Sequence, residues 1–209
     1  MELLDKKVRK ITNPKQRQHW WLALEPQWKK AFNETILRKG PIEDLPSDSD
    51  LIQLFSHKFL RFAGPQAPFP NMSFELTNLS GLTAFTDAEL ISVTYHLLTS
   101  LGEIAHLTKL KNLFADNNRL AEIDGVKNML ALEELFINNN RITTLKPVAK
   151  LTNLKSLYCA ANALTSFDGL TEKHSDKLLH FICLPNEGVH QKELIRVEHT
   201  LGIRCKGFQ

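Results

Sequence analysis

Leucine and other apolar residues recur at a fixed interval through the middle of the chain. Leu110, Leu132 and Leu154 lie 22 residues apart, and the same interval joins four further columns of the sequence. These columns are Leu113, Leu135 and Leu157; Asn118, Asn140 and Asn162; Leu120, Ile142 and Leu164; and Ile123, Leu145 and Phe167. So many columns in phase predict a repeat architecture, in which one supersecondary unit stacks on the next.

Within each unit, two apolar residues flank a single intervening residue, as Leu113 and Ala115 flank Phe114. Side chains of a strand alternate between its two faces, so the flanking residues point into the core and the middle residue points out. One unit cannot bury its apolar face alone. The units must therefore stack side by side.

The three units read LKNLFADNNRLAEIDGVKNMLA, LEELFINNNRITTLKPVAKLTN and LKSLYCAANALTSFDGLTEK. They resemble leucine-rich repeats of the short class with the pattern LxxLxLxxNxIxxIxxLxxL, which also occurs in a regulatory subunit of protein phosphatase and in bacterial internalins. The resemblance implies an α/β fold. It is a right-handed leucine-rich repeat solenoid with a concave parallel sheet, convex 3-10 or short helical turns and a helical N-terminal cap.

The repeat frame extends beyond these units in both directions. One step back, the apolar pattern returns from residue 88 onward, with His96 in the place of the asparagine. Forward by 24 residues, Asn186 takes that place, and a further 22 residues bring Ile203 and Cys205 into the strand columns. We therefore expect residues 88–205 to form the solenoid, including a C-terminal closing turn with a short helix.

Before residue 88 the period is lost and helix signals replace it. Helix starts are indicated at Asn13-Pro14, at Glu25-Pro26 and at the run Ser47 to Asp50, which resembles a capping box. Leu60 and Phe62 predict an irregular first strand, and the proline-rich run 64–70 predicts a loop. We expect residues 1–87 to form a helical N-terminal cap with this strand, covering the open end of the solenoid.

Composition favours a soluble globular chain. The 209 residues are 43% hydrophobic and 23% charged, and 34 of them are leucine. No run approaches the roughly 18 apolar residues of a membrane helix, and no apolar stretch follows the charged N-terminus as in a signal peptide. The cysteine count, three, argues against a disulfide framework and favours a reducing compartment. We expect a cytoplasmic protein, unless an upstream export signal is missing from this sequence.

The outward residues of the strands form the predicted binding face. Phe114, Phe136 and Tyr158 stand in one column, which Ser92 and Ile182 extend. The polar columns beside it contain Asp116 and Asn138, then Arg119 and Arg141, and in the next unit Ala160, Ala161 and Ala163, where we expect a hollow. Aromatic and arginine side chains around a recess are typical of interface hot spots. The alternative is that the rings only shield the sheet from water.

The asparagine column is expected to be structural. The resemblance implies that Asn118, Asn140, Asn162 and Asn186 turn inward and bond the backbone of neighbouring turns, with His96 doing the same in its own unit. Cys159, Cys183 and Cys205 fall in one inward column, where buried thiols act as small hydrophobic groups and react slowly. A metal site or redox pair there is the less favoured interpretation, because in-register parallel neighbours seldom provide the geometry.

No GxSxG, P-loop or HExxH motif occurs, and the eight histidines are scattered. The sequence therefore favours a non-catalytic protein–protein interaction module that binds an unidentified protein on its concave face. We expect no cofactor, metal, nucleic-acid or membrane partner. We also expect a monomer, with a dimer through the concave face as an alternative.

A second hypothesis for the function is an accessory subunit or enzyme with an unrecognised site in the N-terminal region. A distant third is weak nucleic-acid binding through residues 1–17, which hold six basic and two acidic side chains.

Overall fold

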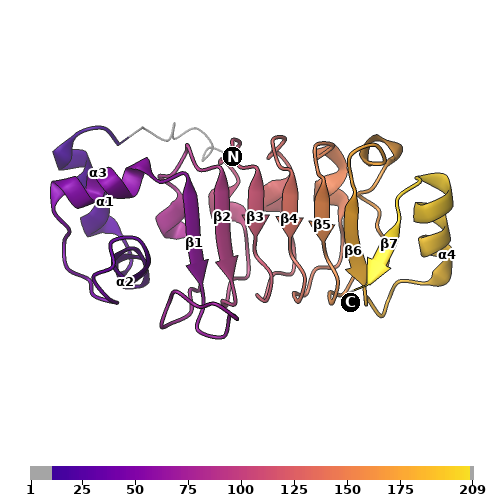
Figure 1. Ribbon diagram of the computed structural model, residues 1–209, viewed down its shortest axis with the longest axis horizontal. Coiled ribbons are helices and arrows are strands. Elements are labelled where there is room, and N and C mark those ends of the chain that lie inside the picture. Colours follow the sequence, from indigo (N-terminus) through magenta and orange to yellow (C-terminus); the bar gives the residue numbers. More distant parts are fainter. Residues whose placement is uncertain (1–10, 208–209) are drawn as a thin grey trace, which may run out of the picture.

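Seven parallel strands form one open sheet, in the order in which they occur along the chain (Figure 1). The computed structural model describes residues 11–207. The strands are β1 (Phe59–Ala63), β2 (Leu90–Thr94), β3 (Asn112–Phe114), β4 (Glu134–Phe136), β5 (Ser156–Tyr158), β6 (His180–Leu184) and β7 (Cys205–Gly207). Standing in a row, they give the molecule an elongated shape, with helices α1 to α3 at one end and α4 at the other.

Short 3-10 turns lie between successive strands, behind the sheet in Figure 1. They are η1 (Ser80–Leu82), η2 (Gly102–Ile104), η3 (Asp124–Val126), η4 (Lys146–Lys150) and η5 (Glu172–His174). The first four turns each bury an apolar side chain, as Ile104, Val126 and Val148 do with no exposed surface, whereas η5 buries His174. The predicted solenoid of strands and convex 3-10 turns is therefore confirmed.

The inward columns of the repeat form the core. Leu113, Leu135 and Leu157 have no exposed surface, and they pair in register along β3, β4 and β5. The residues before and after each of them in these strands are mostly half-buried on the opposite face. Full burial of a leucine side chain contributes about 1.5–3 kcal/mol. The repeated leucines therefore supply a large part of the stabilising apolar burial.

The repeat frame reaches further back than the sequence pattern indicated. β1 pairs with β2 along its whole length, and the paired residues lie nine positions further apart in sequence than those of the regular repeat. On the convex side, however, Leu76, Leu79 and Leu82 are fully buried and lie 22 residues before Leu98, Leu101 and Ile104. The expectation that the period ends near residue 88 is therefore wrong for the convex side. The proline-rich loop after β1 contains an insertion of nine residues, which interrupts the 22-residue period of the strand positions.

Three helices precede the sheet, and they begin where the sequence indicated. They are α1 (Pro14–Ala23), α2 (Pro26–Thr35) and α3 (Asp48–Ser56). Asn13 caps α1 and Ser47 caps α3, each within a capping box. The helices bury Trp21, Trp28 and Phe32, which together with Phe62 of β1 make a dense aromatic cluster. The division into a cap over 1–87 and a solenoid over 88–205 stays a prediction.

The C-terminal turn is closed by α4 (Gln191–Ile195) and a π-helical turn, η6 (Arg196–Thr200). Strand β7 pairs Cys205 with Phe181, and the register is interrupted between Ile182 and Leu184. The predicted alignment of Cys205 with Cys183 is therefore wrong. The residues paired between β5 and β6 lie further apart in sequence than those of the regular repeat. The residues paired between β6 and β7 are separated by the same longer distance.

Candidate protein-binding face

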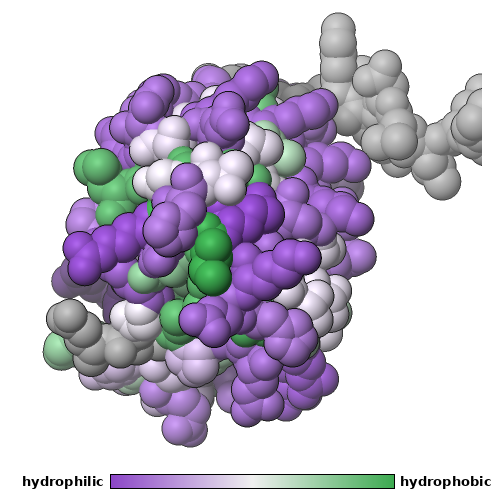
Figure 2. Space-filling view, turned by 90° about the vertical axis from the view of Figure 1, so that its right-hand side faces the viewer, coloured by the Kyte–Doolittle hydropathy of each residue, from purple (hydrophilic) through white to green (hydrophobic). Residues whose placement is uncertain are grey.

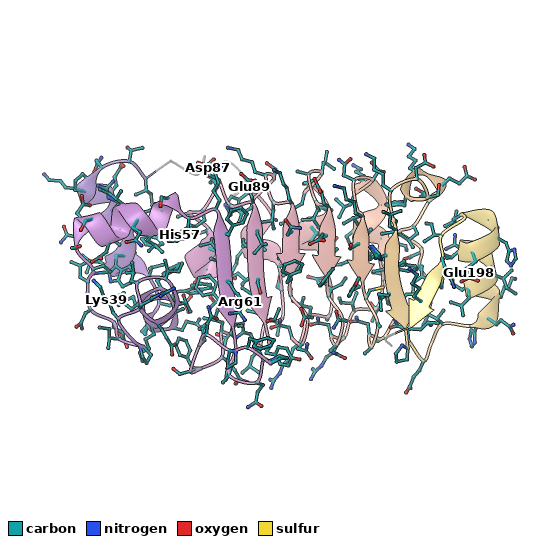
Figure 3. All side chains as sticks on the ribbon, viewed as in Figure 1. Lys39, His57, Arg61, Asp87, Glu89 and Glu198 are labelled. Atoms are coloured by element: carbon teal, nitrogen blue, oxygen red, sulfur yellow. The ribbon has the colours of Figure 1, made fainter. Side chains whose placement is uncertain are left out.

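The outward residues of the strands form one continuous column across the sheet. In-register pairing joins Ser92 to Phe114, Phe114 to Phe136, Phe136 to Tyr158 and Tyr158 to Ile182. The same pairing adds Arg61 at the β1 end and Lys206 at the β7 end. We call these residues the concave column. Figure 3 labels Arg61 on β1, at the edge of the row of strands.

Three rings occupy the middle of the concave column. The ring centroids of Phe114 and Phe136 are 4.8 Å apart at an angle of 50°, and those of Phe136 and Tyr158 are 4.0 Å apart at 8°. Phe136 and Tyr158 are thus stacked. All three side chains are half-buried, so one part of each ring packs on its neighbours while another part meets solvent. Large rings with few rotatable bonds offer contact area at a low cost in entropy.

The polar residues beside the rings differ in their surroundings. Asp116 is half-buried and accepts a hydrogen bond of 2.8 Å from Nδ2 of Asn117. Burial raises the pKa of the Asp116 carboxyl. Asn138, its neighbour on the next turn, is 8% exposed. Arg119 and Arg141 are exposed, and neither forms an ion pair with any residue in 11–207.

The asparagine column lies at the end of the strands and bonds backbone groups of adjacent turns. Nδ2 of Asn118 donates to the carbonyl of Val93 at 2.8 Å, and its Oδ1 accepts from the amide of Leu98 at 3.1 Å. Asn140 repeats this pattern with the carbonyl of Ala115, and Asn162 repeats it with the carbonyl of Ile137. Asn186 donates to the carbonyl of Cys159. These side chains satisfy buried backbone groups that would otherwise lack partners.

His96 has the same role at the first position of this ladder. Its Nδ1 accepts from the amide of Leu76 at 3.1 Å, and its Nε2 lies 3.3 Å from the carbonyl of Phe62. A neutral ring with its proton on Nε2 satisfies both contacts. The side chain is 3% exposed, and desolvation lowers the pKa of His96 to about 4. The imidazole is therefore neutral at physiological pH and acts as a substitute for asparagine.

Comparisons with known proteins agree with this geometry. The sequence profile described as Leucine Rich repeats (2 copies) matches residues 131–172. Internalin C2 of Listeria monocytogenes has a similar fold, with a TM-score of 0.52 and 22% identity over 64% of this chain. The chain therefore contains leucine-rich repeats and has the fold of a leucine-rich repeat solenoid. Among curated protein sequences, no significant match is found.

Two further solved structures share the fold of this leucine-rich repeat protein. The internalin inlF of Listeria monocytogenes has a TM-score of 0.53 and 19% identity over 78% of this chain. A leucine-rich repeat protein of Leptospira interrogans has a TM-score of 0.58 and 16% identity over 82%. The chain spans 41–54% of the length of these three structures. Leucine-rich repeat proteins are in general modules for protein interaction, and typically not enzymes.

The alanine side of the face differs from its regular neighbours. Ala160 is fully buried and therefore lines no recess, whereas Ala161 is half-buried and Ala163 is exposed. An open cleft of about 560 Å³ lies elsewhere, on the convex side, between Asp124, Lys127 and Lys150. The hollow expected beside Tyr158 stays a prediction.

The cysteines of this leucine-rich repeat protein are free thiols. Cys159 and Cys183 are fully buried, while Cys205 is half-buried on β7, the last strand of the sheet. Within residues 11–207, no group of three His, Cys, Asp or Glu side chains could hold a metal ion. Over the same part of the chain, no helix is long and apolar enough to cross a membrane.

Sequence reasoning missed the two charged ends of the concave column. Arg61 stands before a nine-residue insertion, so its distance from Ser92 hid its place in the column. Lys206 was missed because β7 was placed two residues out of register. Leu60 and Phe62 have the same separation as Ile91 and Val93, their partners on β2, and this shared apolar spacing was the signal that could have located Arg61. Nothing comparable in the sequence fixes the register of β7.

Proposed function

We propose that this leucine-rich repeat protein is a non-catalytic interaction module that holds a protein partner on its concave face. The partner would contact the three rings of Phe114, Phe136 and Tyr158. The neighbouring polar side chains that would add hydrogen bonds and ion pairs are Asp116, Asn138, Arg119 and Arg141, with Ile182 extending the apolar part. The general role of the fold in protein interaction supports the class of function.

One observation carries the proposal, namely three adjacent rings that remain partly exposed in the concave column. Their stacking fixes the rings before any partner arrives, which reduces the ordering cost of binding. The exposed side chains of Arg119 and Arg141 suit charged groups of a partner. Rigid aromatic surface bordered by Arg side chains has the composition of interface hot spots.

The principal alternative is that the rings shield the sheet from water. On that hypothesis the stacked rings contribute to stability and not to recognition, because they cover backbone and each other. The two hypotheses differ in what an aromatic-to-serine change does. Loss of partner binding with little loss of stability indicates recognition, and loss of stability alone indicates shielding.

The hypotheses of an enzymatic site in residues 1–87 and of a basic nucleic-acid arm receive less support. The described helices α1 to α3 bury Trp21, Trp28 and Phe32 in a core, and several of the polar side chains there cap helices or form ion pairs. Of the basic segment 1–17, residues 1–10 lie outside the described residues. A monomer in the cytoplasm is the state we favour, because three unpaired thiols suit a reducing compartment.

The test is a double replacement, Phe136→Ser with Tyr158→Ser, used as bait beside the original chain. Proteins captured from native lysate of the source cells are compared, and the affinity of a partner specific to the original chain is then measured with purified components. We expect the replacement to weaken binding by more than about 2 kcal/mol, or roughly 30-fold, because both hot-spot rings are lost. The melting temperature should change little.

The matched control replaces two exposed apolar side chains that lie away from the face, Leu130→Ser with Ile195→Ser. Like the ring variant, it replaces two large side chains by serine. It should leave the affinity for the partner within about twofold of the original. If the double ring variant binds its partner normally, or if it unfolds, the proposed face is wrong. Weakening by the control would show that the loss is not specific to the face.

A further inference from the structure

Asp116 lies two residues after Phe114, just past the end of β3, and no described cation pairs with its carboxylate. Its single side-chain donor is Nδ2 of Asn117, at 2.8 Å. Among residues 11–207 it forms no ion pair. By contrast, Glu89 accepts from Nζ of both Lys58 and Lys111, which lowers the pKa of Glu89 to about 2. The environment of Asp116 has the opposite effect, since burial raises its pKa.

The groups around Asp116 are neutral or aromatic. β3 ends at Phe114, but Ala115 is still fully buried, so Asp116 projects to the same side as Phe114, two residues earlier. Backbone bonds from Tyr95 N to Asp116 O (3.1 Å) and from Asn117 N to Asn138 O (3.0 Å) fix the adjacent turns on either side. The ring of Phe114 continues into that of Phe136. A half-buried negative charge therefore stands at the edge of an aromatic surface.

The described arginines beside the rings form no ion pair with Asp116. Arg119 and Arg141 lie beyond Asn117 and Asn139, whose left-handed backbone (φ 56° and 52°) turns the chain away from the strand direction. Both guanidinium groups are exposed and unpaired within the described part of the chain. A metal ion is also a poor occupant, because residues 11–207 contain no group of three suitable ligands. An organic cation fits the combination of one carboxylate with aromatic rings.

We propose that the partner segment on the concave face presents an arginine side chain, with its guanidinium on Asp116 and its stem or plane against Phe114 and Phe136. The inference rests on the proposed function and names the chemistry of its central contact. A guanidinium is weakly hydrated, stacks on aromatic faces and forms two parallel hydrogen bonds with a carboxylate. It thereby supplies the counter-charge that this carboxylate lacks.

The test uses the full chain and a defined probe, Nα-acetylarginine amide, with Nα-acetylcitrulline amide as its neutral isostere. Carbon-detected NMR follows the Asp116 carboxyl and the Phe114 and Phe136 rings at constant ionic strength. We expect saturable ring shifts with the arginine probe, and a titration midpoint of Asp116 that moves to lower pH because the cation favours the carboxylate. The citrulline probe should produce neither change.

Two charge-matched variants complete the experiment. Asp116→Asn should weaken binding of the arginine probe at least threefold, on the order expected for one exposed ion pair on an aromatic surface. Glu122→Gln removes the same charge from an exposed position and should bind as the original chain does. Equal binding of both probes, or unchanged arginine binding to Asp116→Asn, overturns the inference. The proposed face fails separately, when Phe136→Ser with Tyr158→Ser retains its protein partner.

Discussion

The N-terminal and C-terminal ends of the solenoid are closed in different ways. At the N-terminal end, Trp28 and Phe32 have no exposed surface and pack on Phe62 of β1, with ring centroids 5.3 and 5.7 Å away. At the C-terminal end, α4 has no buried residue and all of β7 is half-exposed. Figure 2, which faces this end, shows a small apolar patch surrounded by hydrophilic side chains.

This difference indicates that the N-terminal end of the sheet is covered more firmly than the C-terminal end. An open repeat end exposes apolar core and an unpaired strand edge, and both must be covered. Large buried rings cover the N-terminal end, whereas Val197, Leu201 and Ile203 cover the other. Glu198, labelled in Figure 3, adds a hydrogen bond of 3.1 Å from the amide of Cys205. We expect the N-terminal end to unfold with the repeats and the C-terminal turn to open first.

The largest effect is expected at Trp28. Its indole packs on Phe32 and Phe62, and a Cβ added at Gly81 would lie 2.2 Å from the indole, so the fit is close. We expect Trp28→Ala to lower the free energy of unfolding by about 3–5 kcal/mol, measured by urea denaturation. Val197→Ala, the corresponding core change at the other end, should cost about 2 kcal/mol. Equal losses at the two ends would contradict the comparison.

His96 makes the N-terminal end sensitive to acid. The pKa of His96 falls from 6.5 to about 4 on folding, because burial disfavours the charged ring. Between these pH values the unfolded chain binds the proton that the folded chain excludes, so stability decreases as pH falls from 6.5 to 4. The loss at His96 amounts to about 3 kcal/mol. His96→Asn keeps the ladder bonds and should remove this part of the pH dependence, measured as unfolding free energy against pH. If the unfolding free energy of His96→Asn depends on pH as steeply as that of the original chain, His96 is not the source of the acid sensitivity.

The rates at which the thiols react should show that the C-terminal end is less firmly packed than the repeats. Burial raises the pKa of Cys159, whereas a hydrogen bond from Cys183 lowers the pKa of Cys205. Cys205 is also only half-buried, whereas Cys159 and Cys183 are buried. We expect a thiol reagent to label Cys205 at least tenfold faster than Cys159 in the folded chain, as resolved by peptide mass spectrometry. Rapid labelling of Cys159 or Cys183 would show that the core near β6 opens readily.

The smallest effect is expected in the middle of the sheet. Ala161 has φ 53°, at the position where the two preceding turns have Asn117 and Asn139 in the same left-handed conformation. Asparagine tolerates this conformation better than alanine does. Ala161→Asn should therefore stabilise the fold by about 0.5–1 kcal/mol, measured by thermal unfolding. The control Ala163→Asn, at an exposed position, should change stability little. A destabilised Ala161→Asn variant would contradict this explanation of the turn.

The regular turns were predictable from sequence because each column repeats its chemistry. Leu113, Leu135 and Leu157 define the strands without any other information, and the outward place of Phe136 follows from alternation. Periodicity failed where the period changed. The insertion after β1 separated Leu76 from its strand, and the last turn kept a longer offset that no apolar column marks. The desolvation of Asp116 depends on packing across turns, which spacing along the chain does not specify.

Hydrogen exchange of the full chain, resolved by mass spectrometry, measures whether the N-terminal helices and the repeats unfold together. We expect the helical N-terminal end and the repeats to make one cooperative unit, which presents a preformed concave face. Peptides covering α2, β1 and β3 to β5 should then exchange slowly and together, while those covering α4 and β7 exchange at least tenfold faster. Exchange of α2 well ahead of β3 to β5, or equal protection of β7 and β1, would contradict the account.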